Sequence, residues 1–115
     1  MKALAYLVLC LAPLAIVGAA QDEPVPGKVT LVYFWAAWCG PCRQLSPALQ
    51  KMADTDHDIV LRKINADEQP AELQKHNVTA LPVVKVYNRG GSLVGTVVGS
   101  DVDKIKSYVT QAKGA

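Results

Sequence analysis

The sequence predicts an α/β domain in which helices flank a four-stranded mixed sheet. Residues 29–35 read VTLVYFW, a β-branched and aromatic run without polar alternation, which is typical of a central strand buried on both faces. Between residues 42 and 52 the apolar positions recur at the helical intervals of three and four. The segment Asn88-Arg89-Gly90-Gly91 separates two later apolar runs, as a hairpin turn does. One sheet is therefore expected to contain both parallel and antiparallel strand pairs.

The composition limits the classes of protein to consider. The chain has 115 residues, of which 50% are hydrophobic and 19% charged. This length accommodates one domain and excludes a multidomain enzyme with a cofactor fold of its own. With 12 Lys and Arg against 10 Asp and Glu, the net charge of +2 gives no electrostatic footprint for nucleic acid. Three cysteines are too few for a disulfide scaffold or a four-thiolate zinc site.

The first twenty residues have the layout of a secretory signal peptide. A positively charged start is followed by an uncharged apolar run over residues 3–17 and by small residues at 18–20. The alternative is an uncleaved membrane anchor over residues 3–20, which is close to the lower length limit for a span and is interrupted by Pro13. We therefore expect residues 1–20 to be removed on export, to a compartment where disulfides persist.

The first half of the expected domain, which spans residues 29–115, alternates strand and helix. Residues 21–28 (QDEPVPGK) are polar and rich in proline, so we expect a linker there. After the first strand, Pro41 suits the first turn of an amphipathic helix that Pro47 is expected to kink. Residues 59–65 (IVLRKIN) then form a second strand, parallel to the first because a helix connects the two.

The second half of the chain is expected to form a short helix, a hairpin and a last helix. The short helix covers residues 71–76, and strands at 83–87 and 93–98 lie on either side of the hairpin turn. Ser100 and Asp103 have the spacing of a capping box and are followed by a helical apolar stripe. The order of elements is thus β-α-β-α-β-β-α.

The chemistry that the sequence predicts lies at Cys39 and Cys42. Cys39 follows the buried strand and stands at a helix N-terminus, where unpaired N–H groups and the helix dipole favour negative charge. Its thiol should therefore ionise more readily than a free cysteine, and the thiolate is the form that attacks disulfides. Cys42 lies one helical turn further and is placed to attack the mixed disulfide that Cys39 forms. Gly40 permits the close approach, and Pro41 fixes φ without needing a hydrogen bond.

Two other uses of the cysteine pair, a structural disulfide and a zinc site, fit the sequence less well than redox exchange. A purely structural disulfide that closes so short a ring would stabilise the domain by only about 2 kcal/mol. A zinc site would need His57 and His76, and neither has ligand spacing to the cysteines. Redox exchange is the favoured interpretation, and no metal is expected.

Residues 34–42 (FWAAWCGPC) resemble the active-site signature of the thioredoxin family. The resemblance runs from about Val29 to the C-terminus and is far more specific than a bare C-x-x-C pair. It implies a thioredoxin fold, here without the usual leading strand and helix because only residues 21–28 precede the first strand. Further segments that carry it are Pro47, Lys63-Ile64-Asn65-Ala66-Asp67, Leu81-Pro82 and Val98-Gly99.

The resemblance also implies roles for single residues. Cys39 would be the nucleophile and Cys42 the resolving thiol. The Leu81-Pro82 bond would be cis, and Leu81 would offer backbone hydrogen bonds to an extended client peptide. Residues that would support the active site are Trp38, Gly40, Pro41 and Lys63. Residues that would bind the substrate are Trp38, Leu81, Pro82 and Gly99.

The sequence departs from the family pattern at three points. Tyr33 stands where the family typically carries a buried aspartate that is thought to accept a proton from the second cysteine. Without it, Lys63 or water would have to deprotonate Cys42. The missing leading strand leaves one sheet edge bare, or met by a partner. Val83 follows Pro82 where threonine is common, so an altered substrate preference is expected.

These features predict a thiol–disulfide oxidoreductase that needs no cofactor besides its own Cys39–Cys42 disulfide. A neutral Gly-Pro pair between the cysteines resembles that of reducing family members, so we expect reduction of disulfides in exported client proteins. The alternatives are an oxidase or isomerase in the same compartment and a non-catalytic binding module. The resemblance further implies a protein of the bacterial periplasm that takes electrons from a membrane donor. Because the net charge is small, no nucleic acid is expected as a partner.

Overall fold

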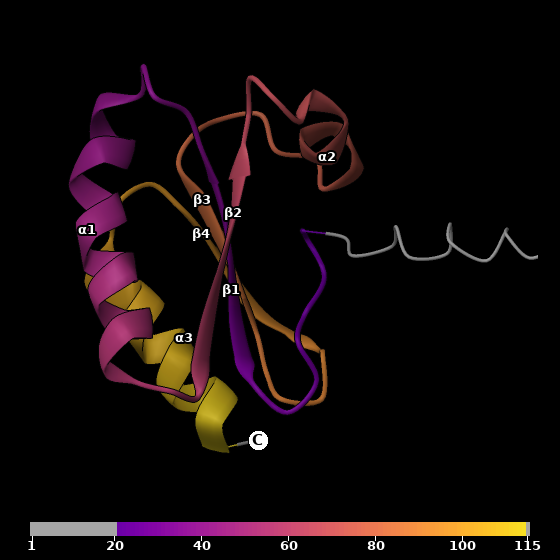
Figure 1. The fold of residues 1–115 in the computed structure, drawn as a ribbon, viewed down its shortest axis with the longest axis vertical. Coiled ribbons are helices and arrows are strands. Elements are labelled where there is room, and N and C mark those ends of the chain that lie inside the picture. Colours follow the sequence, from indigo (N-terminus) through magenta and orange to yellow (C-terminus); the bar gives the residue numbers. More distant parts are fainter. Residues whose placement is uncertain (1–20, 115) are drawn as a thin grey trace, which may run out of the picture.

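The computed structural model describes residues 21–114, and the expected signal peptide or anchor, residues 1–20, lies outside them. The described residues form four strands and three helices in the expected order, and all four strands have the limits predicted from the sequence (Figure 1). No helix in this part of the chain is long and apolar enough to cross a membrane. The elements are β1 (Val29–Trp35), α1 (Gly40–Thr55), β2 (Ile59–Asn65), α2 (Pro70–Lys75), β3 (Val83–Tyr87), β4 (Leu93–Val98) and α3 (Val102–Gly114).

The strand β1 lies inside a mixed sheet with the order β2-β1-β3-β4. It runs parallel to β2, with Val29 opposite Ile59, because α1 carries the chain back between the two strands. It runs antiparallel to β3, which forms the expected hairpin with β4. In the hairpin turn, Oδ1 of Asn88 accepts the backbone N–H groups of Gly90 and Ser92, each at 3.0 Å. In the described part of the chain, β2 and β4 are therefore the edge strands.

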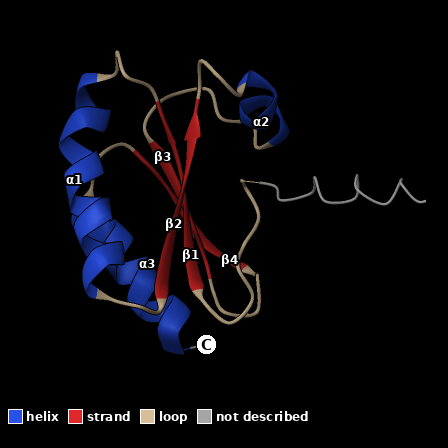
Figure 2. Ribbon diagram, in the orientation of Figure 1, coloured by secondary structure: helices blue, strands red, loops and turns tan. Residues whose placement is uncertain are grey.

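Alternate residues of β1 build two cores, one on each face of the sheet. Leu31 and Tyr33 belong to the cluster that α1 and α3 cover, whereas Val32 and Phe34 belong to the cluster against which Leu73 of α2 packs. The ribbon shows the same division, with α1 and α3 on one side of the sheet and α2 on the other (Figure 2). Because all four of these β1 side chains are inaccessible to solvent, the prediction of a strand buried on both faces is confirmed.

Residues 21–28, predicted as a linker, contain no helix or strand but are fixed to the domain. Asp22 is only 3% exposed, and its Oδ2 lies 2.8 Å from Nζ of Lys75 and 2.7 Å from Nε2 of His76. Burial alone would raise the pKa of Asp22, but hydrogen bonds with Lys75 and His76 outweigh it and lower the pKa to about 2. No local pattern predicts this contact, because Asp22 and His76 lie 54 residues apart.

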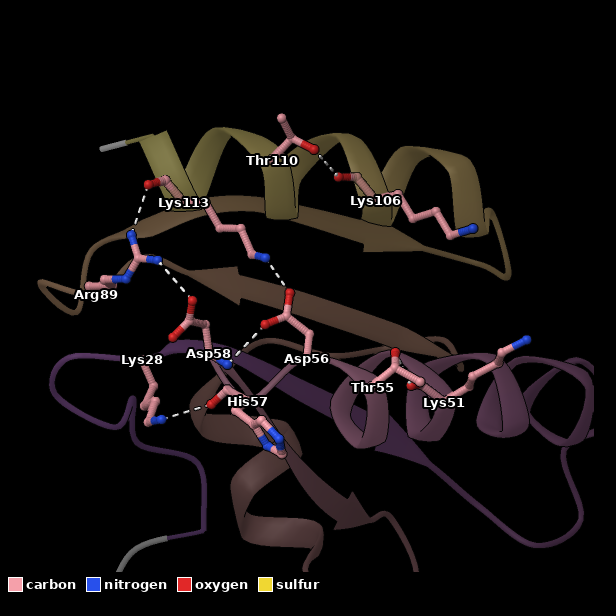
Figure 3. A network of polar contacts seen from close by, with 10 residues as sticks. All are labelled: Lys28, Lys51, Thr55, Asp56, His57, Asp58, Arg89, Lys106, Thr110 and Lys113. Carbon is pink, nitrogen blue, oxygen red and sulfur yellow. Dashed lines mark hydrogen bonds and ion pairs between the residues drawn. The ribbon is translucent and has the colours of Figure 1, made fainter.

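A second polar network joins the C-terminal end of α3 to the hairpin turn and to the loop that follows α1 (Figure 3). Lys113 forms an ion pair with Asp56, and Nη1 of Arg89 donates to the carbonyl oxygen of Lys113 at 2.8 Å. Arg89 also lies 3.5 Å from Oδ2 of Asp58. Arg89 of the hairpin therefore caps the last turn of α3. This network lies at the C-terminal end of α1, whereas the two cysteines lie at its N-terminal end.

The predicted capping box at the start of α3 is wrong by one residue. The backbone N–H of Lys104 donates to Oδ1 of Asp101 at 3.0 Å, so Asp101 caps the helix that begins at Val102. Serine and aspartate are about equally favoured as caps. The local pattern therefore did not distinguish Ser100 from Asp101.

The Asp22 contact predicts a pH-dependent stability. Asp22→Asn is expected to lower the free energy of unfolding by about 1–2 kcal/mol at pH 7, a value reduced because Lys75 is largely exposed. The folded-state pKa lies below the ordinary 3.8, so the stabilisation is present above about pH 4 and is lost as the pH falls through about 2. Urea unfolding across this range measures the effect. Glu23→Gln, at the exposed neighbour, is the control; an equal loss in both variants would contradict the prediction.

Candidate active site

The turn after β1 places Cys39 at the N-cap position, immediately before α1 begins at Gly40. Cys39 has extended backbone angles (φ −87°, ψ 110°) and caps the helix, with Pro41 in the first turn. Its Sγ accepts the backbone N–H of Cys42 at 3.2 Å. The sulfur therefore lies at the positive end of the helix dipole, where a thiolate is stabilised.

The two cysteines are joined by a disulfide, with their Cα atoms 5.2 Å apart. Cys39 is 5% exposed, whereas Cys42 is completely buried. Both pack with Ala36, and Leu81 lies against the same cluster. A reagent from solution therefore meets the sulfur of Cys39 first.

Trp38 projects from the turn and is 67% exposed. Its Nε1–H donates to both carboxylate oxygens of Asp67, at 3.2 and 3.1 Å. Asp67 follows β2 and was not predicted as a site residue. The position of Asp67 two residues beyond a strand parallel to β1 is the signal that would have identified it. The indole is thus held in one orientation while its face remains open.

The loop that enters β3 packs against the cysteine cluster through Leu81. The Leu81-Pro82 bond is cis, which the family resemblance implied. The carbonyl oxygen of Pro82 accepts the backbone N–H of Gly99 at 2.8 Å, and Gly99 has φ +108°, which favours glycine. The four predicted substrate-binding residues thus have different surroundings. Leu81 contacts the cysteine cluster, and Pro82 and Gly99 are hydrogen-bonded to each other. Trp38 is hydrogen-bonded to Asp67.

Lys63 lies beside α1, on β2. Its Nζ is 4.8 Å from the ring centroid of Trp35, a cation–π contact of the ammonium form. The same two side chains line an open pocket of about 460 Å³ along the first turns of α1, together with Arg43, Ser46, Pro47 and Gln50. The predicted supporting lysine is therefore engaged with an aromatic ring on one wall of this pocket.

Tyr33 lies directly beneath the second cysteine. Its side chain is completely buried, and its hydroxyl donates to the carbonyl oxygen of Cys42 at 2.9 Å. The hydroxyl is also 2.7 Å from Oγ of Ser46, which donates to the same carbonyl oxygen at 2.9 Å. Burial raises the pKa of Tyr33, and the opposing effect of the Ser46 hydrogen bond is smaller. The phenol is therefore neutral at physiological pH, and Ser46 is a contact that the sequence analysis missed.

Comparison with known proteins agrees with this geometry. The family model described as Thioredoxin matches residues 17–111. The chain belongs to the thioredoxin family. It is 44% identical over 73 residues to a thioredoxin of Streptomyces clavuligerus, covering 64% of this chain and 67% of that protein. It is 36% identical over 95 residues to a thioredoxin of Malassezia sympodialis, covering 79% of this chain and 90% of the relative.

Solved thioredoxin structures have the same fold. The structure of Fasciola hepatica thioredoxin superposes with a TM-score of 0.70 at 28% identity and covers 76% of this chain and 84% of its own. The Malassezia sympodialis thioredoxin gives a TM-score of 0.66 at 34% identity, covering 76% of each chain. Against Thioredoxin O1, mitochondrial, of Arabidopsis thaliana, this chain is 39% identical over 94 residues, covering 80% of itself but 46% of that protein. With its Cys39–Cys42 disulfide, this thioredoxin-family protein is a thiol–disulfide oxidoreductase.

The different exposures of the two sulfurs predict selective alkylation. In the reduced protein at pH 7, iodoacetamide is expected to modify Cys39 about tenfold faster than a free cysteine and to leave Cys42 almost unmodified, because the helix start favours the thiolate of Cys39. Peptide mass spectrometry over a time course measures both rates. Cys42→Ser should keep the fast reaction and Cys39→Ser should lose it. Equal modification of both positions would contradict the prediction.

Proposed function

We propose that this protein reduces disulfides of exported client proteins, with Cys39 as the attacking thiolate and Cys42 as the resolving thiol. The observation that carries the proposal is the position of the Cys39 sulfur, which caps α1 and accepts the N–H of Cys42. The same hydrogen bond is available to a thiolate, so the charge needed for attack forms in a site already arranged for it.

The proposed reaction has two exchange steps. The Cys39 thiolate attacks one sulfur of the client disulfide, a mixed disulfide forms, and the other client sulfur leaves as a thiolate. Cys42 then attacks the sulfur of Cys39, its proton passes to solvent or to a leaving thiolate, and the second client sulfur departs. Two electrons move from the enzyme dithiol to the client, and the enzyme is left with the Cys39–Cys42 disulfide.

The surface around the disulfide supports a protein client in extended conformation. Exposed Trp38 directly precedes Cys39, and Leu81, next to Pro82, packs against the cluster that contains both cysteines. We infer that the backbone of Leu81 pairs with the client, in the manner of strand addition, while Trp38 covers the client next to the reacting sulfur. Gly99 lets the chain turn back beside Pro82.

The sequence supports export, and the family resemblance supports a membrane source of electrons. The apolar run at 3–17 and the small residues before Gln21 support cleavage of a signal peptide, and retention as an anchor is the alternative. A reductase in an oxidising compartment needs a donor of two electrons per cycle. We infer a membrane protein with an exposed dithiol as that donor.

The proposed direction of electron flow predicts a reducing potential. Equilibration with mixtures of reduced and oxidised glutathione should place the Cys39–Cys42 couple below about −200 mV, and the reduced protein should reduce insulin disulfides in the presence of dithiothreitol. The neutral Gly40-Pro41 pair is the reason, because it adds no cation that would favour the thiolate. A potential near about −120 mV would indicate a disulfide oxidase instead. Failure of the wild type to reduce insulin would favour the binding module.

Export predicts where the clients are found. The full chain carrying Cys42→Ser and an affinity tag is expected to retain mixed disulfides with exported proteins, at least about tenfold above the background of Cys39→Ser, since only Cys39 attacks clients. Mass spectrometry of the captured proteins and of the mature N-terminus measures both outcomes. Clients confined to the cytosol would contradict the export proposal. An intact residue 1 would contradict cleavage and favour the anchor. Either result would leave the oxidoreductase activity standing.

A further inference from the structure

Three oxygen atoms meet beneath the second cysteine, where β1 packs against α1. The hydroxyl of Tyr33, Oγ of Ser46 and the carbonyl oxygen of Cys42 lie 2.7 to 2.9 Å from one another. Tyr33 is anchored in the core by its neighbours on the sheet, and Ser46 follows Cys42 by one turn of the helix. The backbone of Cys42 is therefore tied to the middle of the sheet by side chains rather than only by its own helix.

We propose that Tyr33, assisted by Ser46, is a positioning residue for the resolving thiol. The pair fixes the backbone of Cys42 so that its sulfur stays in reach of the Cys39 sulfur once a client is attached. This inference rests on the proposed two-step reaction and concerns only its second step. Cys39 caps the helix through its own contact with the N–H of Cys42, and within residues 21–114 Tyr33 forms no hydrogen bond with either sulfur.

The proton count of the three oxygens makes the two hydroxyls partly interchangeable. Tyr33 and Ser46 each supply one proton, whereas the carbonyl of Cys42 only accepts. In every arrangement that uses both protons in this triangle, the carbonyl accepts at least one hydrogen bond from a hydroxyl. Removal of one hydroxyl therefore leaves the other to bond the carbonyl, and removal of both leaves neither.

The pair acts by position and not by taking a proton from Cys42. Burial raises the pKa of Tyr33, so its phenol is uncharged at neutral pH and is not a base. In the resolving step the bond between Cys39 and the client sulfur breaks, the Cys39–Cys42 bond forms, and the Cys42 proton ends on solvent or on the client thiolate. No oxidant besides the mixed disulfide is required.

The test separates the two exchange steps within one reaction. Reduced full-length protein carrying Cys10→Ser is mixed with one equivalent of 5,5′-dithiobis(2-nitrobenzoate) in a stopped-flow instrument. Attack by Cys39 releases one coloured thiolate, and attack by Cys42 on the mixed disulfide releases the second. The two phases thus report the nucleophile and the resolving thiol independently.

Tyr33→Phe is expected to slow the second phase about fivefold and to leave the first within about twofold, since it removes one neutral hydrogen bond and keeps the ring. Ser46→Ala should have a smaller effect of the same kind, and the double variant should lose more than the two single effects combined. Tyr87→Phe is the matched control, because Tyr87 is a partly buried tyrosine of β3 that belongs to the other core.

The possible results are distinct. A folded Tyr33→Phe protein with an unchanged second phase, or with both phases slowed equally, would overturn the positioning role. If Tyr33→Phe does not fold, Ser46→Ala carries the test, and an unchanged second phase there would also overturn it. A wild type that releases only one thiolate would contradict the proposed two-step function itself, which is a separate failure.

Discussion

The placement of one sulfur at the start of a helix depends on the burial of the strand that precedes it. β1 is enclosed by a core on each face, so neither its direction nor its register can change without exposing apolar surface. The chain leaves this strand at Trp35 and reaches Cys39 within a short turn. The helix that follows packs Leu45 and Leu49 into the same core. Cys39 is thereby fixed at the junction of two rigid elements, with the backbone N–H of Cys42 in the first turn of α1 directed at its sulfur.

The interior of the site is held by neutral groups. A carboxylate buried beneath Cys42 would carry a large desolvation cost and would oppose a second negative charge on either cysteine. The phenol of Tyr33 has a smaller cost, because both of its hydrogen-bonding partners are in place. A protein with this arrangement gives up a buried base and gains a rigid support for the backbone of its resolving cysteine. The charge that matters for exchange is then the thiolate of Cys39 and the helix dipole beside it.

Local patterns in the sequence predicted the elements, while contacts between distant residues remained hidden. All four strands have the predicted limits because β-branched apolar runs and the Asn88 turn are local signals. The ion pair of Asp22 with Lys75 and the bond from Trp38 to Asp67 join segments far apart in the chain, and no periodicity encodes them. The cap of α3 was misplaced because two adjacent residues suit the position equally well.

At the site itself, the cysteine pair and the cis Leu81-Pro82 bond were recognisable from motifs. From the sequence, Tyr33 could be recognised only as a replacement of the family's buried aspartate. Its hydrogen-bonding partner could not be predicted, because Ser46 has no feature that distinguishes it from other polar residues on a helix. The spacing of Ser46 to Cys42 becomes informative once Tyr33 is known to point at that turn. Family resemblance identifies what is absent, and side-chain geometry is needed to identify what has replaced it.

The unequal burial of the two sulfurs sets the order of events in the proposed reaction. Cys39 is 5% exposed and can be contacted by a client disulfide, whereas Cys42 is inaccessible to solvent. Cys42 in turn has one disulfide within reach, the one that Cys39 has just formed. Because Tyr33 ties the backbone of Cys42 to the sheet, the Cys42 sulfur is held close to the mixed disulfide and needs no large motion to attack it. Release of the client therefore depends on how firmly the resolving cysteine is held, while capture of the client depends on the charge and exposure of Cys39.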